Sequence, residues 1–571
     1  MSETNANRQI ARAAGTVMIA IILGQLAGLV RGILVARAFG ASPELDAFFA
    51  ANRVSETLFL LVAGGALGSA FIPMFTGLLA KKETDSAWRL ASSLAKVVTL
   101  ILSLLAVLSA VFAPQIVRYA LAPGLSTDPQ LFALTVSLLR IQLIAAILFG
   151  LGGLVVGILN AHQIFLLPAL TPAMYQLGII FGAVALAPRI GIYGLAWGVV
   201  IGAALYLLLQ IPSLFKLIYP LRPTDTFATL APGASAGEHT VSAPKSTIKN
   251  QNNYSKYLLW VWGRTGGGLG LHDSNVRQVL ILMGPRLLGV AVVQLNFWVN
   301  TWLASQMAPG SVTGLYYGFS LMLMAQAAIA QSVAIAAMPT FSAQYALGKQ
   351  SEMRASLAAA LRGVIFLALP ASVGLILLRE PLVSLLYQRG EFDERSVQLV
   401  AWSLLWYAAG LVGHSIMEVL TRAFYAQQDT KTPVIIGSIA MGLNVIFSVG
   451  FSKLFEQIGW MPHGGLALAN SFATALEAIA LFIMMRKRLN GIEGKHLVKG
   501  FGASALAVCA MGFGLLAWSQ VAKDWGIFLI TLGGVTIGGG IYALSMWMLR
   551  TPELSFIVNG IKSRTSRQVN K

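Results

Sequence analysis

The chain has 571 residues, of which 56% are hydrophobic and only 11% charged, and its 40 Lys and Arg residues outnumber its 22 Asp and Glu residues. A mean hydropathy of +0.73 lies outside the range of soluble globular domains and predicts an all-α protein that crosses a membrane many times. The basic residues are spread over short loops, which argues against a nucleic-acid-binding surface, and the single Cys509 excludes an internal disulfide framework.

Apolar runs of about 20 residues recur along the chain, and each is long enough to cross the hydrocarbon core of a bilayer. The first run is too long for the apolar part of a signal peptide, so it is expected to be the first membrane helix. We predict about fourteen spans in all. Their approximate bounds are 13–38, 44–79, 88–113, 128–160, 168–187, 191–218, 276–307, 313–345, 355–378, 393–424, 432–453, 461–485, 497–520 and 525–549.

Residues 221–275 are rich in Ser, Thr, Pro, Ala and Asn and are too polar to form a packed core. They predict a cytoplasmic linker between six helices in residues 1–220 and six in residues 276–490. Two further helices and a basic tail follow in residues 491–571. The segment Gly263–Gly270 lacks the Gly-Lys-Ser/Thr ending of a phosphate-binding loop, so we expect no nucleotide site.

The two sets of six helices are similar in sequence. FIPMF at Phe71–Phe75 matches MPTF at Met338–Phe341, and two further prolines, Pro114 and Pro168, have partners at Pro381 and Pro433. The spacing is nearly constant at about 266 residues, which indicates a duplication, and an even number of spans makes the repeats parallel. Such repeats predict two lobes around a central cavity that opens to either side of the membrane in turn.

The distribution of basic residues predicts the orientation of the chain. Well over half of the Lys and Arg residues fall on one side if both termini are cytoplasmic, as the positive-inside rule requires. Clusters on that side are Lys81 with Lys82 and Arg89, Arg486 to Arg488, and the C-terminal tail.

Among the ionisable residues within or beside the apolar sequence of residues 21–61 are Arg31, Asp46, Arg53 and Glu56. Charges at membrane depth are costly and usually mark a transport path. Arg53 and Glu56 are also spaced to pair with each other on one helix. Arg31 has no acidic neighbour one turn away, so it needs a partner from another helix, water or an anionic substrate. Asp46 either pairs with an arginine or caps the second helix.

Polar residues in the first helix of each repeat are further candidates for substrate contacts. Gln25 lies in the first predicted helix, and Gln294, Asn296 and Asn300 lie in the seventh. These amides suit contacts with sugar or peptide, and the alternative is hydrogen bonding between helices. Glu418 and Arg422, four residues apart in the tenth span, are expected to pair with each other.

The segment VRGILVARAFGASPELDAFFAANR at Val30–Arg53 resembles the MurJ/MviN family, the peptidoglycan lipid II flippases of the multidrug/oligosaccharidyl-lipid/polysaccharide exporter superfamily. The resemblance implies fourteen helices in the bacterial inner membrane and a cationic cavity that accepts undecaprenyl-pyrophosphate-linked disaccharide-pentapeptide from the cytoplasmic leaflet. Other similar segments are AFIPMF at Ala70–Phe75, GILNAHQIFLLPAL at Gly157–Leu170, MGPRLLGVAVVQLN at Met283–Asn296, YYGFSLM at Tyr316–Met322, LYQRGEFD at Leu386–Asp393 and RAFYAQQDTKTP at Arg422–Pro433.

The resemblance carries over to individual residues unevenly. Arg31 and Asp46 match charged residues of the family, whereas Gln25 stands where the family has an arginine, and two further family arginines fall near Phe59 and near Ser320. Arg53 is a candidate to replace one of those charges from a nearby helical turn. A guanidinium keeps its charge and presents a planar fork of donors, so Arg31 and Arg53 are expected to contact a diphosphate.

The expected function is therefore that of a lipid II flippase for cell-wall synthesis and cell shape, working by alternating access. The membrane potential or a Na⁺ or H⁺ gradient would drive it, with no cofactor, and its partners would be lipid II, membrane lipids and cell-wall synthesis proteins. Alternatives are an exporter of another lipid-linked oligosaccharide or of a drug, and a non-transporting envelope scaffold. A membrane enzyme would require an acid/base or metal cluster, which the sequence does not present.

Overall fold

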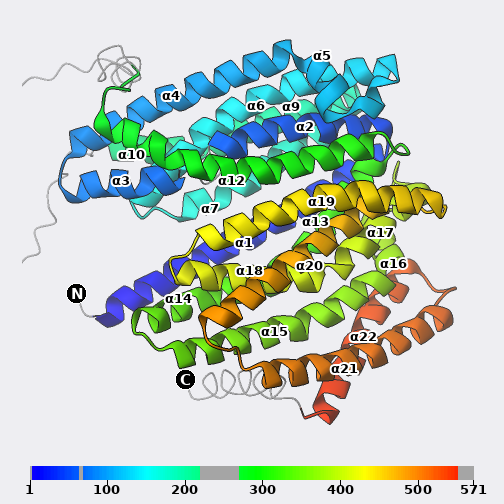
Figure 1. Cartoon of the computed structure of the whole chain (residues 1–571). Coiled ribbons are helices and arrows are strands. Elements are labelled where there is room, and N and C mark those ends of the chain that lie inside the picture. The colour runs from blue at the N-terminus through cyan, green and yellow to red at the C-terminus, as the bar shows by residue number, and fades with distance from the viewer. Residues whose placement is uncertain (1–2, 63–67, 219–268, 551–571) are drawn as a thin grey trace, which may run out of the picture.

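The computed structural model describes residues 3–62, 68–218 and 269–550. Most of the predicted linker and the basic tail lie outside these ranges. Every regular element among the described residues is a helix, as the composition predicts (Figure 1). Eleven of the described helices are long and apolar enough to cross a membrane, and thirteen spans result if each of two bent pairs counts as one. The remaining predicted span, 44–79, is covered by α2 and α3 on either side of residues 63–67, which are not described.

The first half of the structure, defined here as α1 to α10, covers residues 3–218. Short helical turns join its longer helices at several points, and α7, η4 and α8 follow one another directly. The elements are α1 (Glu3–Phe39), α2 (Pro43–Val62), α3 (Gly68–Ala80), α4 (Thr84–Val111), α5 (Ala113–Gln115), η2 (Ile116–Leu121), η3 (Pro123–Ser126), α6 (Pro129–Ala161), α7 (Leu166–Phe181), η4 (Gly182–Leu186), α8 (Ala187–Ile190), α9 (Tyr193–Leu208) and α10 (Ile211–Ile218).

The second half, defined as α12 to α20, covers residues 274–488, and two more helices follow it. Its elements are α12 (Ser274–Ser305), α13 (Ser311–Gln326), η5 (Ala327–Gln331), α14 (Ser332–Ala346), α15 (Gln350–Leu377), α16 (Arg379–Tyr387), α17 (Glu394–Ala409), α18 (Leu411–Ala426), α19 (Lys431–Gln457) and α20 (His463–Arg488). The last two are α21 (Gly494–Val521) and α22 (Ile527–Met548), which pack against α15.

The packing of the second half repeats that of the first. Contacts of α2 with α6, α7 with α9 and α1 with α7 correspond to contacts of α13 with α17, α19 with α20 and α12 with α19. Helices α4 and α15 have the same length of 28 residues at equivalent places. A duplication accounts for this order, while the exact division into domains at residues 220, 276 and 490 remains a prediction.

The helix ends gather at two ends of the bundle (Figure 1). We call the end where α1 begins, α10 ends and α12 begins the near end, and the end where α1 ends and α2 begins the far end. At the far end, Asp128 caps α6 by accepting a hydrogen bond from the Gln130 amide at 2.7 Å. Asp393 caps α17 in the same way, with the Ser396 amide at 2.8 Å.

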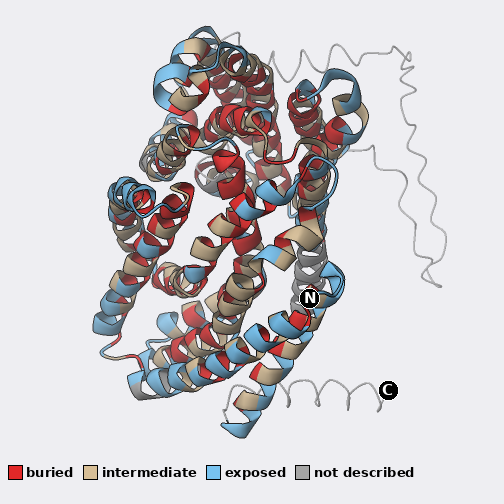
Figure 2. Cartoon of the chain, turned by 90° about the vertical axis from the view of Figure 1, so that its right-hand side faces the viewer, coloured by how far each residue is buried: buried red, intermediate tan, exposed pale blue. Residues whose placement is uncertain are grey.

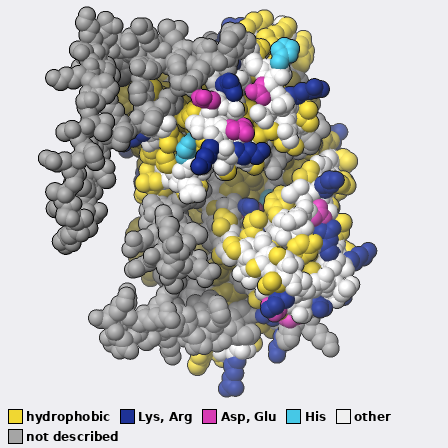
Figure 3. Space-filling model, turned by 90° about the vertical axis from the view of Figure 1, so that its left-hand side faces the viewer, with side chains coloured by type: hydrophobic (Ala, Val, Ile, Leu, Met, Phe, Trp, Pro, Cys, Tyr) yellow, Lys and Arg dark blue, Asp and Glu magenta, His cyan; other side chains and the backbone are white. Residues whose placement is uncertain are grey.

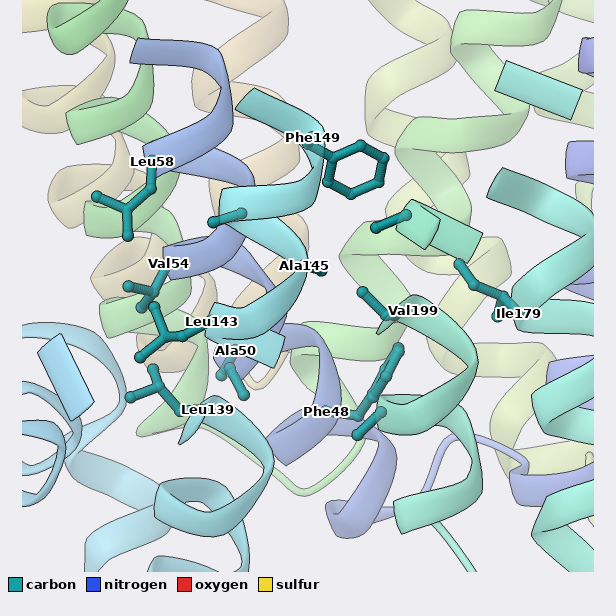
Figure 4. Packing of buried hydrophobic residues seen from close by; sticks show 14 of the residues in the cluster. Phe48, Ala50, Val54, Leu58, Leu139, Leu143, Ala145, Phe149, Ile179 and Val199 are labelled. Atoms are coloured by element: carbon teal, nitrogen blue, oxygen red, sulfur yellow. The ribbon is translucent and has the colours of Figure 1, made fainter. Parts of the chain in front are cut away.

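Apolar side chains between α2, α6 and α9 hold the first half together. Figure 4 labels members of this cluster on these helices and shows Val54 of α2 beside Leu143 of α6. The same buried cluster continues across the far end into α13, α16 and α17. Figure 2, viewed from the far end, shows buried residues concentrated in the interior. Large apolar side chains on the outside, such as Phe513 of α21, fit a lipid-facing surface.

Candidate functional site: a cavity between the two halves

A cavity of about 610 Å³ lies between the two halves. Its walls come from α1, α2, α6, α7 and α9 of the first half and from α12, α13, α17 and α20 of the second. At the near end the molecular surface is hollowed between the two groups of helices, and Lys and Arg side chains lie around this recess (Figure 3). The wall combines two arginines, one glutamate and several amides with many aromatic rings.

Arg31 lines this cavity from α1 and finds its partner in the other half of the protein. Its Nη2 atom donates a hydrogen bond of 2.8 Å to the hydroxyl of Tyr316 on α13, and its guanidinium lies 6.0 Å from the centre of that ring. Among the described residues, no carboxylate forms an ion pair with Arg31. The sequence left the partner of Arg31 open between another helix, water and an anionic substrate. In the structure the partner is a residue of another helix, and that residue is the neutral Tyr316.

Arg53 lines the cavity from α2 and pairs with Glu56, whose Oε2 atom is 3.0 Å from Nη1. This is the local pairing that the sequence offered as an alternative. Arg53 also reaches across the cavity, because its guanidinium lies 4.8 Å from the ring centre of Phe297 on α12. Its buried Nε–H has no hydrogen-bond partner among the described residues. One donor of Arg53 is therefore unpaired in this arrangement.

Two of the predicted polar residues, Gln294 and Asn300, line the same cavity. The Gln294 Oε1 atom accepts a hydrogen bond of 3.4 Å from Thr57 on α2, so it also joins the two halves. Asn300 donates to Asn296 at 3.2 Å. Both predicted roles, cavity lining and bonding between helices, are thus compatible with the observed positions.

Gln25 and Asn296 lie outside the main cavity. Gln25 lines a smaller adjoining space of about 230 Å³ together with Arg31 and Ser320, so the structure does bring it close to the arginine. Asn296 is buried and donates to the Met441 carbonyl on α19 at 3.2 Å, which fits the structural alternative.

Asp46 is the predicted site residue that the structure places elsewhere. It is buried at the far end, within the first turn of α2. Its carboxylate accepts hydrogen bonds from the amide of Gly310 at 2.7 Å and from the amide and hydroxyl of Thr313 at 2.7 and 2.6 Å. Among the described residues, Asp46 thus pairs with no arginine, and its carboxylate caps α13 of the opposite half instead of its own helix.

Close backbone contacts seal the far end beside Asp46. Gly310 has a φ of +90°, and a Cβ added there would lie 2.5 Å from the Ala41 carbonyl oxygen of the first half. A Cβ on Gly124 would overlap the Ser305 carbonyl oxygen on α12. The Ala41 amide donates to Ser396 Oγ at 3.0 Å. The cavity is thus closed at the far end while the near end is hollowed.

Sequence reasoning found the charged residues of the cavity but missed its aromatic rings. Charges inside apolar sequence are conspicuous, whereas aromatic residues are equally common in packed cores. Phe59 was the one aromatic residue of the cavity that the sequence analysis pointed to, because the resemblance places a family arginine near it. The rings that line the cavity are Phe49, Phe59, Phe149, Tyr175, Tyr206, Phe297, Tyr316, Phe319 and Tyr407.

Other membrane-embedded charges lie outside the cavity lining. Glu418 and Arg422 of α18 form the expected ion pair at 3.1 Å. Arg140 of α6 is exposed and donates to the Ala110 carbonyl at 3.1 Å. Within the described parts of the chain, no group of three His, Cys, Asp or Glu residues is placed to hold a metal ion.

Comparison with known proteins places this architecture in a family. The family model described as "Lipid II flippase MurJ" matches residues 35–234 and 264–536. A Burkholderia cenocepacia protein named "Lipid II flippase MurJ" is 31% identical over 523 residues, covering 90% of this chain and 91% of that protein. A "Probable lipid II flippase MurJ" of Vibrio cholerae is 28% identical over 561 residues, covering 95% of this chain and 96% of the relative.

Solved structures share the fold. A structure described as "Lipid II flippase MurJ, inward closed conformation" superposes with a TM-score of 0.72 at 24% identity and covers 93% of this chain and 98% of its own. A multidrug resistance MATE family transporter in an inward-facing conformation superposes with a TM-score of 0.62 at 14% identity, covering 84% and 99%. The resemblance seen in the sequence is confirmed, and the chain belongs to the MurJ family of lipid II flippases, which are membrane transporters and not enzymes.

Proposed function

We propose that the protein carries lipid-linked peptidoglycan precursor from the cytoplasmic to the outer leaflet of the bacterial inner membrane by alternating access. The observation that carries the proposal is the pair of arginines, Arg31 and Arg53, in a cavity between two similar halves that is sealed at one end. The cargo is the one named for the family and for its relatives.

The cavity chemistry supports an anionic headgroup. Arg31, Arg53 and Glu56 are the charged residues of its lining, so the wall carries a net positive charge. An exporter of cationic drugs would instead be expected to have a cavity wall with a net negative charge. A diphosphate carries about two negative charges and several acceptor oxygens, and the guanidinium fork matches such oxygens with charge-assisted hydrogen bonds.

The arginines now hold partners that a diphosphate can replace. Both the Tyr316 hydroxyl and the Phe297 ring are neutral groups of the second half, whereas both arginines belong to the first. Charge-assisted hydrogen bonds to a diphosphate are about twice as strong as neutral ones, so binding would exchange these contacts between the halves for contacts with the cargo. The halves would then be less firmly joined at the arginines, which favours the rocking motion of alternating access.

We assign the near end to the cytoplasm. Lys81, Lys82 and Arg89 lie between α3 and the first turns of α4 at this end, and Arg486 to Arg488 end α20 at the same end. Basic loops face the cytoplasm in membrane proteins. The hollowed near end would therefore admit cargo from the inner leaflet, and the sealed far end would face the periplasm.

The membrane potential is a sufficient driving force for this direction. Moving one charge across 100 mV is worth about 2.3 kcal/mol, so the two negative charges of the diphosphate gain about 4.6 kcal/mol on leaving a negative interior. This argument needs no ion site in the protein.

Transport by purified protein tests the proposal. Fluorescent lipid II would be reconstituted with the protein in phosphatidylglycerol-containing vesicles, and its inward or outward movement followed by quenching with membrane-impermeant dithionite. Arg31→Gln and Arg53→Gln each remove a charged hydrogen bond, typically about 1.5–3 kcal/mol, and should slow flipping at least about tenfold. Arg140→Gln, exposed and outside the cavity, is the matched control and should keep the normal rate.

Full flipping by both cavity variants would refute the role of the arginines. Equal flipping of a different polyprenyl-diphosphate sugar would instead favour the alternative cargo, another lipid-linked oligosaccharide. No flipping by the unaltered protein under an imposed potential would favour the non-transporting scaffold.

A further inference from the structure

The near-end part of the cavity wall is aromatic. Four rings from four helices of the first half line it: Phe59 of α2, Phe149 of α6, Tyr175 of α7 and Tyr206 of α9. Phe149 is the centre of the group. Its ring centre lies 5.0 Å from those of Phe59 and Tyr175 and 5.3 Å from that of Tyr206. We call these four residues the ring cluster.

The opposite wall is aromatic as well. Phe319 of α13 lies between Phe297 of α12 and Tyr407 of α17, with ring centres 5.9 and 5.1 Å away. All three rings line the same cavity. A group that enters between the halves thus meets aromatic surfaces on both sides.

The local backbone makes room for the ring cluster. A Cβ added at Gly152 of α6 would lie 2.5 Å from the ring of Tyr206, so only glycine lets this tyrosine lie against α6. Tyr175 lies beside Asn52, and Tyr206 lies beside Thr171.

Amide groups stand beside these rings. Asn52, Gln176 and Gln294 all line the cavity. The Oε1 atom of Gln176 is buried and has no hydrogen-bond partner among the described residues. A buried polar group without a partner is costly, and a rotation of the Gln176 side chain toward the cavity would let this acceptor pair with a donor of the occupant.

This combination fits one class of ligand better than others. A pyranose presents C–H bonds on its flat faces, which are attracted to the negative face of an aromatic ring, and hydroxyl groups around its edge, which pair with amides. An alkyl chain would leave the amides unpaired. A cationic group would call for carboxylates, and Glu56 is the one acidic residue of this lining, already paired with Arg53.

The geometry relative to the arginines also fits a sugar. Phe59 follows Arg53 by six residues on the same helix, a rise of about 9 Å toward the near end. That distance accommodates a pyranose attached directly to a diphosphate held at Arg53. We propose that the ring cluster is a sugar-binding subsite for the saccharide next to the diphosphate of the cargo. This inference rests on the proposed function, since it takes the diphosphate to bind at the arginines.

Binding of two lipids by the purified full-length protein tests the subsite. One is undecaprenyl diphosphate, and the other is the same lipid carrying the disaccharide without peptide. Phe59→Leu keeps an apolar side chain but removes the ring face, and should weaken binding of the sugar-bearing lipid about tenfold while leaving bare undecaprenyl diphosphate within about twofold. Phe59→Tyr keeps the ring face and should bind both lipids normally.

Control variants separate the outcomes. Phe447→Leu removes a ring from an aromatic group on α19 that does not line the cavity and should leave both affinities unchanged. Arg53→Gln should weaken both lipids. Equal affinities of Phe59→Leu and the unaltered protein for the sugar-bearing lipid would overturn the subsite, as would an equal loss for both lipids. If the unaltered protein binds neither lipid, the proposed function itself fails.

Discussion

Asp46→Asn tests how the far end is held closed. The Asp46 carboxylate now satisfies three donors of the opposite half, two of them backbone amides in the first turn of α13. An asparagine has one acceptor oxygen, so its amide nitrogen would face at least one N–H group that it cannot accept. The favourable interaction of a negative charge with the N-terminus of α13 would be lost as well.

The size of the effect follows from these contacts. Hydrogen bonds to a charged group contribute about 1.5–3 kcal/mol each, and the helix end adds about 0.3–1 kcal/mol. Removing a buried charge also removes its desolvation cost, which offsets part of the loss. A net loss of about 2 kcal/mol would shift the equilibrium between far-end-closed and far-end-open forms about 30-fold toward the open form.

Distances across the far end measure this shift. Thr127 and Gln306 are exposed, lie on opposite halves and line one surface pocket, so cysteines at both positions can carry spin labels in a Cys509→Ser background. We expect Asp46→Asn to move the distance distribution to longer values. Asp128→Asn is the control, because Asp128 caps α6 within one half. An unchanged distribution in Asp46→Asn would refute the reasoning.

Three other predictions concern single positions. Gly124→Ala should hold the far end open, since the new Cβ would overlap the Ser305 carbonyl; spin-label distances should lengthen, and unchanged distances would contradict this. Glu56→Gln should tighten binding of undecaprenyl diphosphate up to about threefold, because the half-exposed Glu56 carboxylate would no longer compete with the diphosphate for Arg53. Weaker binding would argue against this competition. Burial alone would raise the pKa of Asp429, but hydrogen bonding and its ion pair with Arg488 lower it to about 2. Any stabilisation that Asp429→Asn removes should therefore be constant above about pH 5 and disappear as the pH falls toward 2, as thermal unfolding of both proteins would show.

The membrane helices were predictable because their signal is local. The span expected at 88–113 corresponds to α4 at Thr84–Val111, and that expected at 461–485 corresponds to α20 at His463–Arg488. Apolar runs of this length can satisfy their backbone hydrogen bonds in a bilayer only as helices. The cavity arginines were predictable for the same reason, since a charge inside such a run is rare.

The partners of these residues were not predictable, because they depend on contacts between distant parts of the chain. Asp46 and Gly310 are 264 residues apart, and the sequence around Asp46 reads equally well as the start of a helix. Helical periodicity also fails to separate a ring that faces a cavity from one that faces a core. Phe149 and Tyr206 therefore emerged only once α6 and α9 were placed side by side.

The far-end seal has a consequence for how the protein tolerates change. Gly40, Gly124, Gly310 and Gly390 each bring main-chain atoms of one half against main-chain atoms of the other. At these four positions the nearest atoms across the junction are carbonyl oxygens of the main chain, which cannot be changed by substitution. Adding even one methyl group at any of these four glycines would force the two halves apart. Substitution at these positions should therefore prevent the far end from closing.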